Sequence, residues 1–195
     1  MEVILNNMPG DTIYSATTGR ATRELFFLRE KRSETKAHDF LNVGSMGHAS
    51  SVALGIALEK PERKVVALDG DSACMMHMGA MTMVSKLDVP NFMHVVLNNG
   101  SHESVGGQPS AGHKVDFTKI AEACDYATVG HPVTTEVELM EALEVLRNCG
   151  KASFIDCRIH KGLSRKLPPV IFDHREVIDA LIDNLNESRI TMDKK

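Results

Sequence analysis

Two short segments determine how this chain folds: Lys64-Val65-Val66-Ala67-Leu68-Asp69-Gly70-Asp71-Ser72 and Met93-His94-Val95-Val96-Leu97-Asn98-Asn99. Each is apolar without alternation and then ends in polar residues, which is typical of a parallel strand buried on both faces. Between them, Cys74 to Lys86 carries apolar side chains at broadly helical spacing, and Pro90 stops the helix before the second strand. Strand, helix and strand in this order predict a parallel sheet covered by helices.

The same alternation continues outward in both directions. Further elements are predicted as a strand at Ile13–Ala16, a helix at 47–58, a helix at 118–125, a helix opened by the capping box Thr135-x-x-Glu138 and stopped at Gly150, a strand at Phe154–Cys157 and a terminal helix opened by Asp173-x-x-Glu176. Glu2 to Leu5 reads as the last turn of a helix. We therefore expect one three-layer α/β/α domain over residues 1–195 with a mostly parallel sheet, either cut from a longer chain or a natural subunit.

Composition excludes several classes of protein. The 195 residues include 22 basic and 26 acidic ones, a net charge of −4, and 43% are hydrophobic, which is an ordinary globular balance. No basic stripe is present for nucleic acid, and the longest apolar runs are about a quarter of a membrane span. The four cysteines lack C-x-x-C spacing, which favours reduced, buried thiols over zinc or disulfides. We expect a cytoplasmic protein that binds neither nucleic acid nor membrane.

Polar residues end the two strands at positions that suit a metal. Asp71 follows the first strand and Asn99 the second, and the carboxyl ends of parallel strands face one crevice. A carboxylate and an amide oxygen make half a site for Mg²⁺, which completes its octahedron with phosphate and water. Backbone N–H groups after Ser72 would suit a diphosphate. The polar Gly-, Ser- and His-rich loop 98–112 is too long for a simple connection and is a candidate functional loop.

These residues resemble the diphosphate-binding domain of the thiamine diphosphate enzymes. Gly70-Asp71-Ser72 and Asn98-Asn99 match that family's motif. Val43 to Ser51, His77 to Ala80 and Leu97 to Pro109 narrow the resemblance to phosphonopyruvate decarboxylases, and the sulfopyruvate decarboxylase β subunits are similar but less so in the loop. The resemblance covers roughly residues 10 to 160.

The resemblance implies roles for named residues. Asp71 and Asn99 would bind the metal through side chains and Ser101 through its carbonyl, and His102 and Glu103 are the catalytic candidates. The residues implied to bind the cofactor are Thr18, Gly19, Gly44, Ser45, Met46, Gly70, Asp71, Ser72, Ala73, Asn99 and Ser101. Gly44 would accept a hydrogen bond from the aminopyrimidine through its carbonyl, and Met46 would bend the cofactor. Candidates for a substrate anion are His102, His113, Lys114, Arg20 and Arg23.

The resemblance also implies a missing half. The family's pyrimidine-binding domain, with its activating glutamate, has no counterpart in these residues, so we expect a partner domain or subunit and a homo- or hetero-oligomer. The implied reaction is the thiamine diphosphate- and Mg²⁺-dependent decarboxylation of phosphonopyruvate to phosphonoacetaldehyde and carbon dioxide. Two alternatives stay open: a sulfopyruvate decarboxylase β subunit, and a cofactor-binding module that is inactive without a partner.

Overall fold

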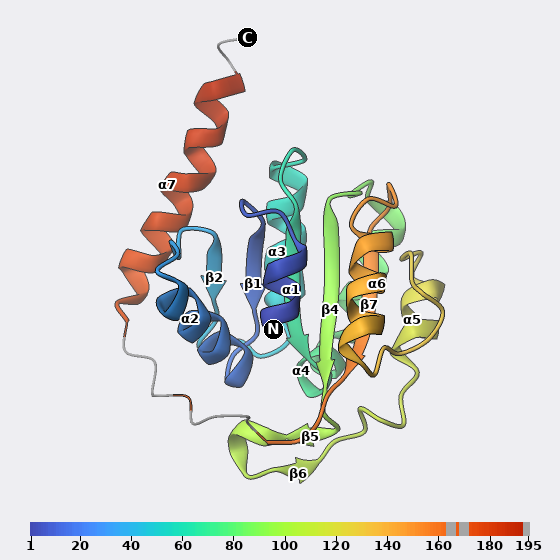
Figure 1. Ribbon diagram of the computed structural model, residues 1–195. Helices are drawn as coiled ribbons and strands as arrows, with labels where there is room; N and C mark the ends of the chain where they lie inside the picture. Colours follow the sequence, from blue (N-terminus) through green and yellow to red (C-terminus); the bar gives the residue numbers. More distant parts are fainter. Residues whose placement is uncertain (163–166, 168–171, 193–195) are drawn as a thin grey trace.

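The computed structural model describes residues 1–162, 167 and 172–192. At its centre lies a five-stranded sheet in the order β2-β1-β3-β4-β7, with every neighbouring pair parallel (Figure 1). The strands are β1 (Ile13–Ala16), β2 (Asp39–Leu41), β3 (Val65–Gly70), β4 (Phe92–Asn98) and β7 (Ser153–Arg158). The chain runs outward from β1 to β2 and then crosses back to β3, so its direction across the sheet reverses between β1 and β3.

Helices cover both faces of this sheet and give the predicted three-layer α/β/α fold. Successive strand residues alternate between two cores: Val65 and Ala67 belong to one, Val66 and Leu68 to the other. The core containing Val66 and Leu68 is completed by α1 (Glu2–Asn7), α2 (Arg20–Arg32) and α6 (Glu136–Leu146). The core containing Val65 and Ala67 is completed by α3 (Ala49–Glu59), α4 (Asp71–Met76), the 3-10 helix η1 (Met78–Lys86) and α5 (Phe117–Ala123). The terminal helix α7 (His174–Met192) lies beside β2 at the sheet edge (Figure 1).

Capping explains where two helices begin. Thr135 accepts a hydrogen bond from the Glu138 N–H, and the Glu138 carboxylate accepts one from the Thr135 N–H, each at 3.2 Å, which confirms the predicted capping box. At α7, the Asp173 carboxylate accepts a hydrogen bond from the Arg175 N–H at 2.8 Å. These local contacts set the starts of both helices.

Some elements depart from the sequence expectation. Neither α2 nor β2 was predicted, because their buried faces include charges: Arg29 binds Asp39 through two hydrogen bonds of 2.9 Å, and both side chains are almost fully buried. The expected continuous helix over 74–86 is wrong. It breaks at His77, whose backbone is not helical and whose ring packs 4.0 Å from the ring of His48.

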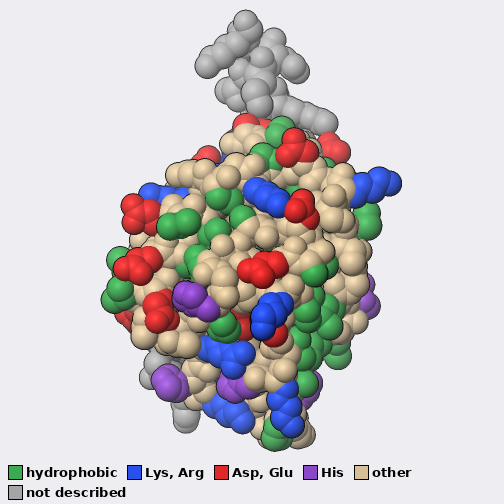
Figure 2. Space-filling model, turned by 90° about the vertical axis from the view of Figure 1, so that its right-hand side faces the viewer, with side chains coloured by type: hydrophobic (Ala, Val, Ile, Leu, Met, Phe, Trp, Pro, Cys, Tyr) green, Lys and Arg blue, Asp and Glu red, His purple; other side chains and the backbone are tan. Residues whose placement is uncertain are grey.

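The surface agrees only partly with what the composition suggested. All four cysteines are free, but Cys149 is exposed, so the expectation that every thiol is buried is wrong. In the part of the chain that the structure describes, none of the helices has the length and apolar character needed to cross a membrane. Figure 2 shows acidic and basic side chains together on the face that α5 and α6 cover, with histidines in its lower half.

Candidate cofactor-binding site

A cavity of about 260 Å³ lies at the carboxyl edge of the sheet. It opens where β1 and β3 end, which is the point where the strand order reverses and where open α/β sheets bind ligands. The predicted functional loop forms one wall. It folds as a small antiparallel hairpin of β5 (Ser101–His102) and β6 (Gln108–Pro109), joined through the 3-10 turn η2 (Glu103–Val105) (Figure 1).

Most residues singled out from the sequence line this one cavity, although they come from four separate parts of the chain. The predicted residues found in its wall are Thr18, Met46, Gly70, Asp71, Ser72, Ala73, Asn99, Ser101, His102 and Glu103. Gly19, Gly44 and Ser45 are not among the lining residues. Gly44 and Ser45 are exposed in the turn before α3, and a side chain at Gly19 would meet Ser104 of the hairpin at 3.2 Å. Of the candidates for a substrate anion, Arg20 and His102 line the cavity, whereas Arg23, His113 and Lys114 do not.

Asp71 is a buried acid of the site. It is the first residue of α4, is 2% exposed, and forms no ion pair with a cation among the described residues. Its Oδ2 accepts a hydrogen bond from the Ser110 hydroxyl, and the Gly112 backbone passes against its carboxylate. A buried carboxylate without a counter-charge is costly, and a bound cation would remove that cost.

Asn98 holds the end of the loop against Asp71. Its Nδ2 donates to the Gly112 carbonyl at 2.9 Å and to the Asp156 carboxylate at 3.0 Å, and its Oδ1 accepts from the Gly100 N–H at 3.3 Å. The two asparagines that end β4 therefore have different surroundings. Asn98 is fully buried and fixes the loop, whereas Asn99 lines the cavity.

The residues present fit a polar ligand with a metal. Three buried polar side-chain atoms of cavity-lining residues have no hydrogen-bond partner in the described part of the chain: Thr17 Oγ1, Ser72 Oγ and Ser101 Oγ. Buried polar atoms are nearly always paired, so these call for a ligand or water. Among the described residues no three His, Cys, Asp or Glu side chains are placed to hold a metal. A metal here would instead use one carboxylate with amide and carbonyl oxygens, a set that suits Mg²⁺.

Burial of the Asp156 carboxylate affects the stability of the fold in a way that depends on pH. Burial raises the pKa of this carboxyl, and the Asn98 hydrogen bond and the Arg158 guanidinium, 3.6 Å away, oppose the rise only in part. A carboxyl whose pKa is higher in the folded state stabilises the fold below its unfolded pKa, and this stabilisation is lost as pH rises through the folded pKa. Asp156→Asn keeps an oxygen for Asn98, so we expect it to raise the melting temperature at neutral pH and to do less at acidic pH. Thermal unfolding at both pH values checks this, and an equal gain at both would contradict it.

Sequence reasoning missed several residues of this site. Ser110, Gly112 and Asp156 reach it only through tertiary contacts, and no motif marked them. The only signal was that Ser110 and Gly112 lie in the loop already predicted to be functional. Glu24, Ile159 and Gly162 also line the cavity.

The fold and the cavity define a doubly wound α/β domain that holds its ligand at the switch point of the sheet. Residues 17–157 match the family described as "Thiamine pyrophosphate enzyme, C-terminal TPP binding domain". The chain belongs to that family, and the resemblance found in its motifs is confirmed.

Two curated relatives illustrate the similarity. Phosphonopyruvate decarboxylase of Streptomyces viridochromogenes is 38% identical over 143 residues, which are 73% of this chain and 34% of that protein. The sulfopyruvate decarboxylase subunit beta of Methanocaldococcus jannaschii is 27% identical over 179 residues, 88% of this chain and 90% of that subunit. The chain thus spans about a third of the phosphonopyruvate decarboxylases that it matches.

A solved structure supports the fold. The thiamine diphosphate-dependent 4-hydroxybenzoylformate decarboxylase of Rhodococcus jostii RHA1 superposes with a TM-score of 0.64 at 19% sequence identity. The superposition covers 82% of this chain and 32% of that one. At this identity the likeness concerns the fold alone.

Proposed function

We propose that this chain supplies the diphosphate- and Mg²⁺-binding half of a thiamine diphosphate-dependent decarboxylase that converts phosphonopyruvate to phosphonoacetaldehyde and carbon dioxide. The observation that carries the proposal is the cavity at the switch point. Asp71 lines it without a counter-charge among the described residues, and three buried polar atoms of its lining residues have no hydrogen-bond partner in that part of the chain. The 38% identity to a phosphonopyruvate decarboxylase supports the substrate.

Each wall of the cavity has a proposed task. Asp71, the Asn99 amide oxygen and the Ser101 carbonyl would hold Mg²⁺, while the backbone at Gly70, Ser72 and Ala73 would face the diphosphate. The loops carrying Thr18, Gly19, Gly44 and Ser45 would border the cofactor, and Met46 would shape it. When bound, the cofactor supplies the thiazolium ring that accepts the electrons left by departing carbon dioxide.

His102 is the candidate for moving a proton. It lies in β5 on the wall of the cavity, and an imidazole ring can both donate and accept a proton through its two nitrogens, so it can deliver the proton that the substrate carbon needs after carbon dioxide leaves. Beside it Arg20, with a side chain 34% exposed, is placed to meet an anionic substrate group at the mouth. The Arg20 guanidinium is planar and rich in donors, which suits carboxylates and phosphonates.

A second candidate substrate has its own support. The match to the M. jannaschii sulfopyruvate decarboxylase subunit beta extends over 90% of that subunit, whereas the match to the Streptomyces enzyme stops at 34% of it. Sulfopyruvate, decarboxylated by a complex of this chain with a separate pyrimidine-binding subunit, is therefore the alternative. A cofactor-binding module without activity of its own is the remaining one.

Release of carbon dioxide separates these candidates. Phosphonopyruvate, sulfopyruvate and pyruvate would be supplied in turn with thiamine diphosphate and Mg²⁺ to this chain alone and to this chain with a pyrimidine-binding half. We expect release only from the combined protein and fastest with phosphonopyruvate. Faster release from sulfopyruvate would favour the alternative substrate. A folded, cofactor-loaded complex that is inactive on all three would contradict a decarboxylase.

A further inference from the structure

Glu103 makes more contacts than a free acid in a loop would. It begins η2 at the tip of the hairpin, and its side chain is 19% exposed. Its Oε2 accepts hydrogen bonds from Asn99 Nδ2 at 3.2 Å and from the Gly162 N–H at 3.1 Å. Arg20 reaches the same residue, with Nη2 3.3 Å from the Glu103 carbonyl and 3.5 Å from Oε1. Three separate segments therefore meet at one carboxylate.

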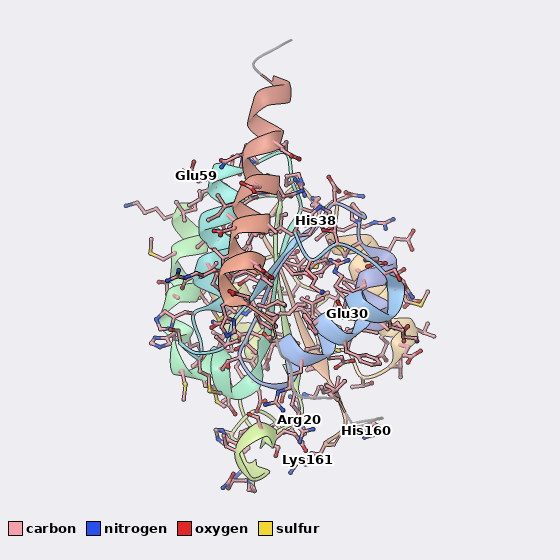
Figure 3. The ribbon with its side chains drawn as sticks, turned by 90° about the vertical axis from the view of Figure 1, so that its left-hand side faces the viewer. Arg20, Glu30, His38, Glu59, His160 and Lys161 are labelled. Atoms are coloured by element: carbon pink, nitrogen blue, oxygen red, sulfur yellow. The ribbon has the colours of Figure 1, made fainter. Side chains whose placement is uncertain are left out.

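These contacts join three segments of the chain that line the cavity. Arg20 begins α2, Asn99 follows β4, and Gly162 follows β7. Figure 3 labels Arg20, His160 and Lys161 at the same end of the molecule, beside the hairpin. Both carboxylate oxygens of Glu103 therefore have partners, which hold the side chain in one position.

The hydrogen bond to Asn99 has a chemical consequence. An asparagine amide has an oxygen end and a nitrogen end, and only the oxygen can bind a metal. Glu103 accepts a bond from the nitrogen end, while the Ser101 N–H donates to Oδ1 at 3.0 Å. Oδ1 keeps a second lone pair for a cation. The oxygen and the nitrogen of the Asn99 amide thus each have a hydrogen-bond partner that fixes their positions before any metal binds.

We propose that Glu103 is a positioning residue that holds the Asn99 amide with its oxygen, not its nitrogen, toward the metal position beside Asp71. This role rests on the proposed function, since it needs a metal at Asp71 and Asn99. It differs from the catalytic role predicted for Glu103 from the sequence and leaves His102 as the candidate for proton transfer. Groups that orient metal ligands commonly change metal affinity by about 10- to 100-fold.

The first experiment measures the affinity of the full chain for Mn²⁺ in the presence of thiamine diphosphate. The electron paramagnetic resonance signal of free Mn²⁺ reports how much of the metal is bound. We expect Glu103→Ala to weaken binding about tenfold, and Glu103→Gln, which keeps one acceptor oxygen, to weaken it less. Glu144→Ala is the control. Glu144 is an exposed carboxylate on α6 that does not line the cavity, so its loss should leave Mn²⁺ affinity unchanged.

The second experiment changes the ligand itself. In Asn99→Asp both ends of the side chain are oxygens, so there is nothing left for Glu103 to orient, and the two carboxylates repel. In that background Glu103→Ala should leave Mn²⁺ affinity unchanged or strengthen it, the opposite of its effect in the wild-type background. A purely structural Glu103 would instead give the same loss in both backgrounds.

The outcomes separate this role from the proposed function. A wild-type chain that binds no Mn²⁺ with thiamine diphosphate would overturn the proposed function, and the role of Glu103 with it. Binding by the wild type that Asp71→Asn abolishes but Glu103→Ala does not weaken would overturn the role of Glu103 alone. An equal loss from Glu103→Ala in the wild-type and the Asn99→Asp backgrounds would overturn it as well.

Discussion

Asp71→Asn is expected to abolish the metal-dependent binding of thiamine diphosphate by this chain. Asp71 is the only carboxylate in the proposed metal set, and the remaining ligands, the Asn99 amide and the Ser101 carbonyl, are neutral. Loss of a mere orienting partner costs about 10- to 100-fold in metal affinity, so loss of the charged ligand should cost at least about 100-fold. Titration calorimetry with Mg²⁺ and thiamine diphosphate measures the effect.

The same substitution should act on stability in the opposite direction. Asp71 is 2% exposed and has no cation partner among the described residues, so removal of its charge breaks no ion pair there. Asparagine keeps an oxygen for the Ser110 hydroxyl and removes the charge. We expect the variant without metal to melt no lower than the wild type. Ligands that bind only the folded state raise the melting temperature, so Mg²⁺ with thiamine diphosphate should stabilise the wild type and not the variant.

Glu144→Gln is the control for both measurements, because it removes an exposed carboxylate on α6 that does not line the cavity. It should bind the cofactor and respond to it as the wild type does. If Asp71→Asn retained the stabilisation by Mg²⁺ and thiamine diphosphate, the metal assignment would fail, even though the family membership would stand.

The elements that could be predicted from the sequence are those buried mainly through apolar side chains. Strands β3, β4 and β7 are buried along almost their whole length, and each contains a short run of apolar residues, so their placement was predicted within a residue or two. Strand β2 has only three residues and begins with Asp39, which is buried because Arg29 neutralises it from α2. Because Arg29 and Asp39 are charged, α2 and β2 each have a charge at a buried position where the apolar pattern of a helix or strand requires an apolar residue. Neither element could therefore be predicted from that pattern.

The candidate site divides in the same way. Asp71 and Asn99 were predicted to meet because both directly follow strands, and parallel register brings strand ends together. Glu103 was found as a loop acid, but its contact with Gly162, which lies 59 residues away, depends on where the segment after β7 passes. Ser110 and Gly112 reach Asp71 only because Asn98 and Asp156 fix the returning loop. Contacts between loops have no periodicity from which to predict them.

Gly112→Ala is expected to disrupt cofactor binding as severely as Asp71→Asn does. A Cβ on Gly112 would overlap the Asp71 carboxylate, and it would lie 2.7 Å from Asp71 Cβ and 2.6 Å from Asn98 Oδ1. These atoms cannot easily move aside, because the side chains of Asp71 and Asn98 are short and are held by hydrogen bonds. The φ of Gly112 is not in the left-handed region, so the expected cost is steric.

Two measurements follow for this variant. Overpacking of buried positions typically costs about 1–3 kcal/mol, so chemical denaturation should show a loss of that order. Because the displaced atoms belong to the proposed metal ligand Asp71 and to Asn98, which anchors the loop, calorimetry should show no binding of thiamine diphosphate with Mg²⁺. The second effect should exceed what the loss of stability explains, since the variant is still expected to fold.

Gly55→Ala in α3 provides the matched control. A Cβ at Gly55 would meet nothing within 4 Å, and alanine in a helix is about 0.5–1 kcal/mol more favourable than glycine. The same chemical change, one methyl group, should therefore stabilise the chain at 55 and leave cofactor binding intact, whereas at 112 it should do the reverse. Wild-type cofactor affinity in Gly112→Ala would mean that the loop can withdraw from Asp71, and the close packing of loop and carboxylate would then not be required for the site.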